Sequence, residues 1–171
     1  MVRSKILTYL VCVVTAVLCF SFEGKAQRFA VSTDLLHWAA LSPGVELDMV
    51  MSPHSSMTFA ASSCPANIGK GFSLAHVTVN PEYKYWFSMP FYRSYVGGDL
   101  MYTAYEADRE TGNTSGSLVS LCASYGYSHI INKRWNIVPH GGLGVGVNFD
   151  DKTRFVPFIF RIGVNIQFVV K

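Results

Sequence analysis

Long apolar runs and helical periodicity are both scarce in this sequence. Beyond residue 27 no uninterrupted apolar stretch reaches the length of about 20 residues that a membrane-spanning helix needs. Apolar residues also fail to recur at the 3.6-residue spacing of an amphipathic helix, which argues against a helical bundle. No linker or low-complexity tract divides the chain after its N-terminal segment. Residues 27–171 are therefore predicted to form a single domain without membrane-spanning helices.

Charge and cysteine are also sparse, and their scarcity excludes other classes. Charged residues make up only 15% of the chain, and the basic ones form no stripe interleaved with aromatics, so we expect no nucleic-acid partner. After the N-terminal segment only Cys64 and Cys122 remain, and their spacing is compatible with one disulfide or with two free thiols. Neither has a neighbouring Cys or His at the spacing of zinc ligands, so no metal and no other cofactor is expected.

The N-terminal segment has the pattern of a secretory signal peptide. Basic residues precede an apolar run, residues 6–22, and small residues surround a cleavage point after Ala26. This pattern predicts a signal peptide over residues 1–26 and export of the remainder. Two alternatives stay open: an uncleaved helical anchor, and a lipoprotein lipidated at Cys19, which follows the bulky Leu18.

The most informative pattern lies at the end of the chain. From Val156 to Val170 every second residue is apolar, and Arg161, Asn165 and Gln167 lie between them. A period of two predicts a β-strand with one apolar face. A strand of this length exceeds what is usual in soluble sheets and suits a tilted passage through a bilayer.

The whole chain can be divided into strands of this kind. The predicted strands are Arg28–His37, Gly44–Met51, Ser56–Ser63, Ser73–Phe87, Tyr92–Ala107, Ser117–Ile130, Arg134–Phe149 and Arg154–Val170. Tight turns alternate with longer, more polar loops, as in outer-membrane barrels, whose turns face the periplasm and whose loops face outward. We predict an all-β fold: an eight-stranded antiparallel up-and-down transmembrane β-barrel, located in the outer membrane and monomeric.

Strand parity assigns a set of charged and polar side chains to the barrel interior. The set is Asp34, Glu46, Asp48, Glu82, Lys84, Arg93, Asp99, His140 and Arg161. Charges of both signs on a buried face must be paired, and an eight-stranded barrel has an interior just wide enough for side chains. We expect a polar network that plugs the lumen. The functional alternatives for these residues are a gated ion path and a carboxylate-based active site. A wide porin channel is excluded because eight strands are too few to enclose one.

Aromatic residues crowd the predicted turns and suggest an interfacial girdle. They are Tyr83, Tyr85, Trp86, Phe87, Phe91, Tyr92, Tyr125, Tyr127 and Trp135. Rings at these depths are typical of membrane-embedded barrels. Ordinary core packing in a soluble β-sandwich is the alternative.

Two glycine-containing motifs have structural explanations. Gly142, Gly144 and Gly146 alternate within one strand, so they are expected to make room in the lumen and to form no phosphate-binding loop. The pattern of Arg161, Gly163, Ile166 and Phe168 resembles the C-terminal signal read by the barrel assembly machinery, although it ends three residues before the C-terminus.

An enzymatic alternative needs a histidine beside a serine near the outer leaflet, as in lipid A-modifying barrels. Ser128 and His129 are adjacent in a strand and so point to opposite faces, beside a turn. His140 has no evident Ser or Asp partner. His76, close to an outer loop, is the remaining candidate.

Several stretches resemble an uncharacterised family of exported proteins from Gram-negative anaerobes, a domain of unknown function expected to form outer-membrane β-barrels. They are Ser32–Leu36, Pro43–Leu47, Pro81–Phe87, Ser124–Tyr127 and Asn132–Asn136. The segment from Cys64 to Phe72 departs from the pattern of the family. The resemblance implies an envelope location and no catalytic residues.

The sequence therefore predicts a membrane-embedded scaffold with a structural or surface-binding role, and it leaves enzymatic activity undecided. Its partners would be outer-membrane lipids, the assembly machinery and a surface ligand or protein. The predicted contact loop spans residues 108–116 and carries Asp108, Arg109, Glu110 and Asn113, because loops on a rigid frame commonly carry binding. A lipid A-modifying enzyme and a soluble periplasmic lipocalin-like carrier are the alternatives.

Overall fold

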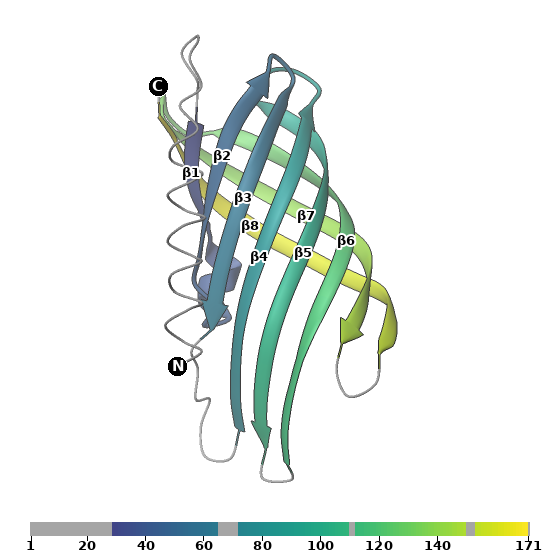
Figure 1. Cartoon of the computed structure of the whole chain (residues 1–171). Coiled ribbons are helices and arrows are strands. Elements are labelled where there is room, and N and C mark those ends of the chain that lie inside the picture. Colours follow the sequence, from purple (N-terminus) through teal and green to yellow (C-terminus); the bar gives the residue numbers. More distant parts are fainter. Residues whose placement is uncertain (1–28, 65–71, 110–111, 150–152, 171) are drawn as a thin grey trace, which may run out of the picture.

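The computed structural model describes residues 29–64, 72–109, 112–149 and 153–170, which form a closed antiparallel barrel of eight strands in sequence order (Figure 1). The strands are β1 (Phe29–Asp34), β2 (Gly44–Ser52), β3 (Ser55–Cys64), β4 (Phe72–Trp86), β5 (Arg93–Arg109), β6 (Gly112–Ile130), β7 (Trp135–Phe149) and β8 (Arg154–Val170). The predicted fold class is thus confirmed. The predicted signal peptide and Glu110 lie outside the described residues.

The barrel closes by pairing its first strand with its last. Phe29 lies opposite Val170, and Asp34 lies opposite Asn165. The start of β1 and the end of β8 therefore share one end of the barrel with the short connections between β2 and β3, β4 and β5, and β6 and β7 (Figure 1, top). We call this the turn end, and the opposite end the loop end.

The first strand is shorter than predicted because the residues after Asp34 form a helix. β1 ends at Asp34, and residues Leu35–Ala39 form the short helix α2. The Asp34 carboxylate accepts hydrogen bonds from the backbone N–H of Leu36, at 2.7 Å, and of His37, at 3.4 Å. An aspartate in this position satisfies N–H groups that have no partner within the helix.

The alternation of β8 is interrupted once, which corrects the uniform apolar face read from the sequence. The β7–β8 register shifts between Gly144, opposite Ile159, and Gly146, opposite Val156. Residues opposite each other share a face, so Val156 faces the lumen with Gly146, whereas Phe158 is 75% exposed. Pro157 lies at the irregularity, where the missing N–H costs no ladder hydrogen bond.

The predicted contact loop is largely strand. Asp108 lies opposite Asn113 in the β5–β6 ladder, and Arg109 lies opposite Gly112. The polar composition of this segment suggested a loop, but continued pairing of two long neighbouring strands satisfies its backbone hydrogen bonds. The two strands project together at the loop end (Figure 1).

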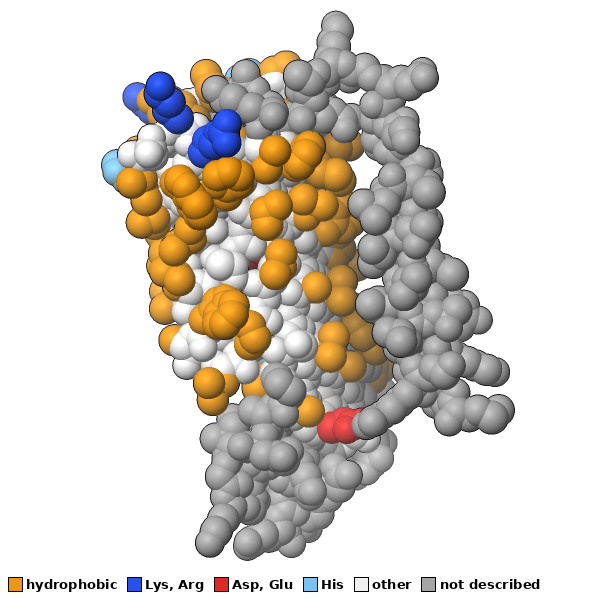
Figure 2. Space-filling model, turned by 90° about the vertical axis from the view of Figure 1, so that its left-hand side faces the viewer, with side chains coloured by type: hydrophobic (Ala, Val, Ile, Leu, Met, Phe, Trp, Pro, Cys, Tyr) orange, Lys and Arg blue, Asp and Glu red, His pale blue; other side chains and the backbone are white. Residues whose placement is uncertain are grey.

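Large apolar side chains cover the outside of the barrel. Figure 2 shows them spread over one face, with Lys and Arg side chains gathered toward the turn end. Outward side chains near the strand centres include Leu100, Leu121 and Leu143, each more than half exposed. The outer surface is thus apolar where a soluble protein would be polar.

Within the described part of the chain, no helix is long and apolar enough to cross a membrane.

Aromatic side chains close the lumen at the turn end. Trp86, Phe91 and Tyr95 are buried there together with Ala30 and Val138. The Trp86 and Tyr95 rings lie 4.8 Å apart, and the Trp86 and Phe91 rings meet edge to face at 5.9 Å. Trp86 and Phe91 therefore fill the barrel and do not belong to an outer girdle, because strand parity turns Trp86 inward. Tyr83, Tyr85, Phe87, Tyr125, Tyr127 and Trp135 are exposed.

Gly126 gives Tyr95 its place in this cluster. A Cβ at Gly126 would lie 2.6 Å from the Tyr95 Oη, whereas a Cβ at Gly98 would meet no atom within 4 Å. Gly126→Ala should therefore destabilise the barrel by about 1–3 kcal/mol through overpacking. Gly98→Ala should be neutral or slightly stabilising, since alanine loses less backbone entropy in a strand. Urea unfolding in detergent micelles measures both, and equal stabilities of the two variants would contradict the packing argument.

Candidate functional site

The lumen on the loop-end side of the aromatic cluster contains an ion-pair network. Its described charged members are Asp48, Glu82, Lys84, Asp99 and Arg161. They come from β2, β4, β5 and β8, so the network joins strands that are far apart in the barrel wall. The closed sheet brings them together because each is at an inward position of its strand.

Lys84 and Asp48 form the core of this network at its turn-end side. The Lys84 Nζ donates to the Asp48 Oδ1 at 2.9 Å and lies 3.8 Å from Glu82 Oε2. Both side chains of the Lys84–Asp48 pair are almost completely buried. The ammonium also lies 5.2 Å from the centroid of the Tyr95 ring, in cation–π geometry. The aromatic cluster and the ion network therefore contact each other and together fill this part of the lumen.

Asp48 is further satisfied by neutral donors. The Thr58 hydroxyl donates to its Oδ1, and Gln167 Nε2 donates to its Oδ2 at 3.0 Å. The Ser32 hydroxyl lies 3.4 Å from the same Oδ2. A buried carboxylate with this many donors and a cation offsets its desolvation, so the network can be stable in the barrel interior.

Arg161 binds two carboxylates at the centre of the lumen. Its Nη2 donates to Glu82 Oε2 at 3.2 Å, and its Nη1 lies 3.3 Å from Asp99 Oδ2. The Ser124 hydroxyl also donates to Glu82. With its amide oriented to satisfy both neighbours, Asn80 donates to Asp99 Oδ1 at 3.2 Å and accepts from Arg161. The planar guanidinium is suited to this bridging position.

A second, smaller pair lies closer to the loop end. His140 Nε2 lies 3.8 Å from Asp34 Oδ2, and Asp34 also accepts from the backbone N–H of Val164 at 3.3 Å. Gly163 lies between the two side chains, and any Cβ there would collide with both. The glycine thus allows β1 and β7 side chains to meet across β8.

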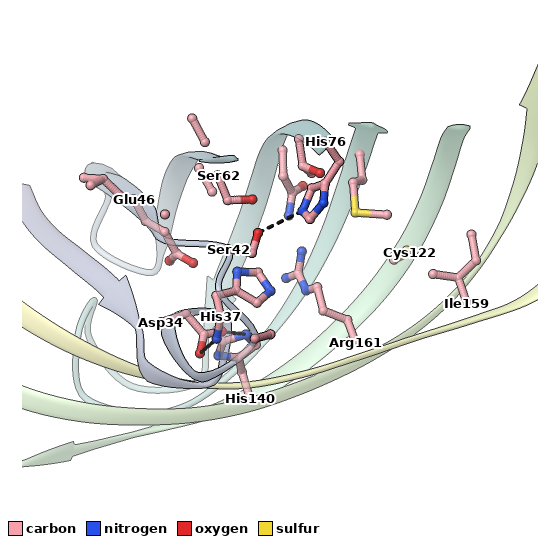
Figure 3. A pocket seen from close by; sticks show the side chains of 18 of the residues that line it. Asp34, His37, Ser42, Glu46, Ser62, His76, Cys122, His140, Ile159 and Arg161 are labelled. Atoms are coloured by element: carbon pink, nitrogen blue, oxygen red, sulfur yellow. Dashed lines mark hydrogen bonds and ion pairs between the residues drawn. The ribbon is translucent and has the colours of Figure 1, made fainter. Parts of the chain in front are cut away.

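A cavity of about 450 Å³ occupies the lumen at the loop end (Figure 3). Its polar lining includes Asp34, His37, Glu46, His76, His140 and Arg161, which come from strands around the whole barrel and from α2. Figure 3 shows His37, His140 and Asp34 close to one another on one side and His76 on the other. Arg161 belongs to both the cavity lining and the ion network, so the network forms the floor of the cavity.

Ser42 and His76 meet at this cavity. The Ser42 Oγ lies 2.8 Å from His76 Nε2, and Ser42 is buried (Figure 3). No carboxylate among the described residues is hydrogen-bonded to His76, so the pair lacks the third group that orients a catalytic histidine. The contact is better explained as a hydrogen bond that holds the connection after α2 against β4.

The structure places the predicted interior residues in the lumen, except for Arg93. Arg93 is exposed at the turn end, and its guanidinium lies 5.2 Å from the Tyr92 ring. Its φ of 62° breaks the regular alternation at the first residue of β5, so parity does not apply there. Asp108 and Asn113 lie on paired strands at the loop end, away from the lumen network.

The predicted site contained only charged residues and one histidine, and it left out the neutral members of the interior. Ser32, Thr58, Asn80, Ser124, Asn165 and Gln167 all contact its charged groups. Their signal was a polar residue at every second strand position, which could have been followed beyond the charged residues. The meeting of Ser42 with His76 depends on the path of an irregular connection and had no sequence signal.

The structure also places the two cysteines and the adjacent pair Ser128 and His129. Cys64 and Cys122 are both free and buried. The Ser128 hydroxyl is buried and donates to the Phe91 carbonyl at 2.9 Å, while its neighbour His129 is exposed. Among the described residues, no group of three or more His, Cys, Asp or Glu side chains is placed to hold a metal ion.

A closed eight-stranded antiparallel barrel with an apolar outside and a polar, side-chain-filled inside defines the class of small outer-membrane-type β-barrels. The chain belongs to the family described as protein of unknown function (DUF3575), whose model matches residues 10–157. This confirms the family resemblance read from the sequence. No curated protein matches the sequence of the chain.

Two solved structures are similar to this barrel. Neisserial surface protein A (NspA) is 11% identical with a TM-score of 0.50, and the match covers 83% of this chain and 94% of NspA. The N-terminal β-barrel domain of Pseudomonas aeruginosa OprF is 8% identical with a TM-score of 0.51, covering 84% of this chain and 97% of that domain. At these identities the likeness is one of fold.

Proposed function

We propose that this protein is a monomeric outer-membrane scaffold with a plugged lumen, which meets surface ligands or partner proteins at its loop end. The observation that carries the proposal is the inversion of polarity: Leu100, Leu121 and Leu143 face outward while Asp48, Lys84 and other charged groups are buried inside. Such a surface is stable against hydrocarbon and is a liability in water. A soluble carrier would require the opposite arrangement.

The filled lumen favours a scaffold over a channel. The Trp86 cluster closes the turn end, and the Arg161 network crosses the middle of the barrel. The turn end would face the periplasm and the loop end the exterior, the usual orientation of barrels with these connections. The paired ends of β5 and β6, with Asp108, Arg109 and Asn113, are the proposed protein-contact segment, together with Glu110, which lies outside the described residues.

Export and insertion complete the proposal. Residues 1–26 would direct the chain across the inner membrane and be removed. The Arg161, Gly163, Ile166 and Phe168 pattern would be read by the assembly machinery. Of these, Arg161 and Gly163 also have roles inside the finished barrel, since one bridges carboxylates and the other makes room for Asp34 and His140.

Cell fractionation combined with gel migration tests the location. The mature chain should sediment with outer membranes, require detergent for extraction, and migrate differently on gels before and after boiling, because an intact small barrel resists unfolding by the detergent. Recovery as a soluble monomer from periplasmic extracts without detergent would refute the proposal. Planar bilayers should show no steady conductance for the wild-type protein.

A further inference from the structure

The loop-end cavity is closed on the side that faces the turn end, and we call it the cup. Its floor is the Arg161 network, and the lumen beyond that floor is filled by Lys84 and the Trp86 cluster. Its rim is formed in part by His37 of α2 and by the exposed Ala40, which follows that helix. A volume of about 450 Å³ lies within the range of small-molecule sites. A guest could therefore enter from the loop end and would not pass through.

Among the described residues inside the barrel, the carboxylates of Asp34, Glu46, Asp48, Glu82 and Asp99 outnumber the two cationic side chains, Lys84 and Arg161. Lys84 and Arg161 are each shared between carboxylates of the network: Lys84 contacts Asp48 and Glu82, and Arg161 contacts Glu82 and Asp99. Glu46 receives only neutral donors among the described residues. Asn165 Nδ2 donates at 2.6 Å and the Ser32 hydroxyl at 3.3 Å, both to Oε2. The other oxygen, Oε1, receives no hydrogen bond from the described residues.

Asn165 fixes one side of the Glu46 carboxylate from behind the cavity wall. It is 4% exposed and is not part of the cavity lining. Its Nδ2 is engaged with Glu46 Oε2, and its own Oδ1 has no hydrogen-bond donor among the described residues. Because Asn165 occupies Oε2, Oε1 of Glu46 is the acceptor that this residue of the cavity wall can offer to a guest.

We propose that this cup binds a small organic cation, with a primary ammonium group seated at Glu46. The inference deepens the proposed surface role, since it rests on the loop end facing the exterior and names the class of ligand bound there. An ammonium brings three donors and a positive charge to a wall with unmatched carboxylate charge. An anion would meet the carboxylates of Asp34 and Glu46 and find both terminal nitrogens of Arg161 already engaged with Glu82 and Asp99.

Calorimetric titration of the full chain, folded in detergent micelles, tests this inference. The probe is cadaverine, and its neutral counterpart of the same length is 1,5-pentanediol. Cadaverine should bind wild-type protein and pentanediol should not. Glu46→Gln, which keeps the shape and can still accept from Asn165, should weaken cadaverine binding by at least about tenfold because the charge is lost.

Glu106→Gln is the matched control, because it removes the same charge from an exposed site on β5. It should bind cadaverine like wild type. Absence of cadaverine binding, equal binding of the diol, or unchanged binding by Glu46→Gln would each overturn the inference. Gel migration before and after boiling is recorded for each variant, so a failure of the cation site in an intact detergent-extracted barrel remains distinct from a failure of the membrane proposal. Ala60→Phe, which fills the cup without changing charge, should also abolish binding.

Discussion

Replacing Arg161 by methionine should destabilise the barrel by about 3–5 kcal/mol, the cost of leaving buried carboxylates without their cation. Asp99 would lose the cation that lies 3.3 Å from its Oδ2, and Glu82 would keep only Lys84, 3.8 Å away. Methionine retains much of the apolar length of arginine, so the loss reports the charge and hydrogen bonds more than the volume. Urea unfolding of the folded barrel in lipid vesicles, followed by tryptophan fluorescence, measures the change.

The control for Arg161→Met is Arg93→Met, since Arg93 is exposed at the turn end. That variant should unfold within about 0.5 kcal/mol of wild type. Adding Asp99→Asn to Arg161→Met should recover part of the lost stability, because the uncompensated charge is then removed. Additive effects of the two substitutions would show that Arg161 and Asp99 do not interact, contrary to the geometry.

The strands and their faces were predictable because apolar and polar residues alternate along the sequence with a period of two. Alternation placed Asp48, Glu82, Lys84, Asp99 and Arg161 inside without any knowledge of their partners. An even number of long strands with an apolar outer face leaves few architectures besides a closed barrel. The fold and the membership of the central network were therefore accessible from local patterns.

The sequence did not predict the positions where the backbone departs from strict alternation of inward and outward side chains. The helix after Asp34 had a visible signal, an aspartate preceding Leu35 and Leu36, but a strand pattern extends over the same residues. The shift near Pro157 reverses the face of Val156, and the positive φ of Arg93 leaves its side chain exposed although the residue is paired with Ser128. Such features depend on register and turn geometry, which nonlocal pairing decides.

The loop-end cup was less predictable than the ion network. Asp34, Glu46 and His140 were assigned to the interior, but their approach to His37 and His76 requires the path of α2 and the connection to β2. That path is fixed by contacts such as the 2.8 Å Ser42–His76 hydrogen bond. Parity shows which way a strand residue points and says nothing about an irregular segment, so the cavity could be found only in three dimensions.

The outward face is the basis of the membrane proposal, and one substitution tests it directly. Leu121 lies near the middle of β6 and is 63% exposed on the outside of the barrel. In a bilayer, Leu121→Arg should cost about 2–4 kcal/mol, because the guanidinium would be placed near the hydrocarbon midplane. In water the same change at an exposed site should be nearly neutral. Unfolding from lipid vesicles measures the difference.

Ile131→Arg provides the comparison at the edge of the membrane. Ile131 is similarly exposed, but it lies in the turn that carries Lys133 and Arg134, where a charge can reach headgroups and water. Its cost should fall to about 0–1 kcal/mol, following the depth dependence of lipid-facing arginines. If Leu121→Arg were as stable as Ile131→Arg, water would have to surround the middle of the barrel, and the scaffold could not be a membrane-embedded one. A clear difference between the two depths, present in lipid vesicles, is the result expected when hydrocarbon surrounds the middle of β6.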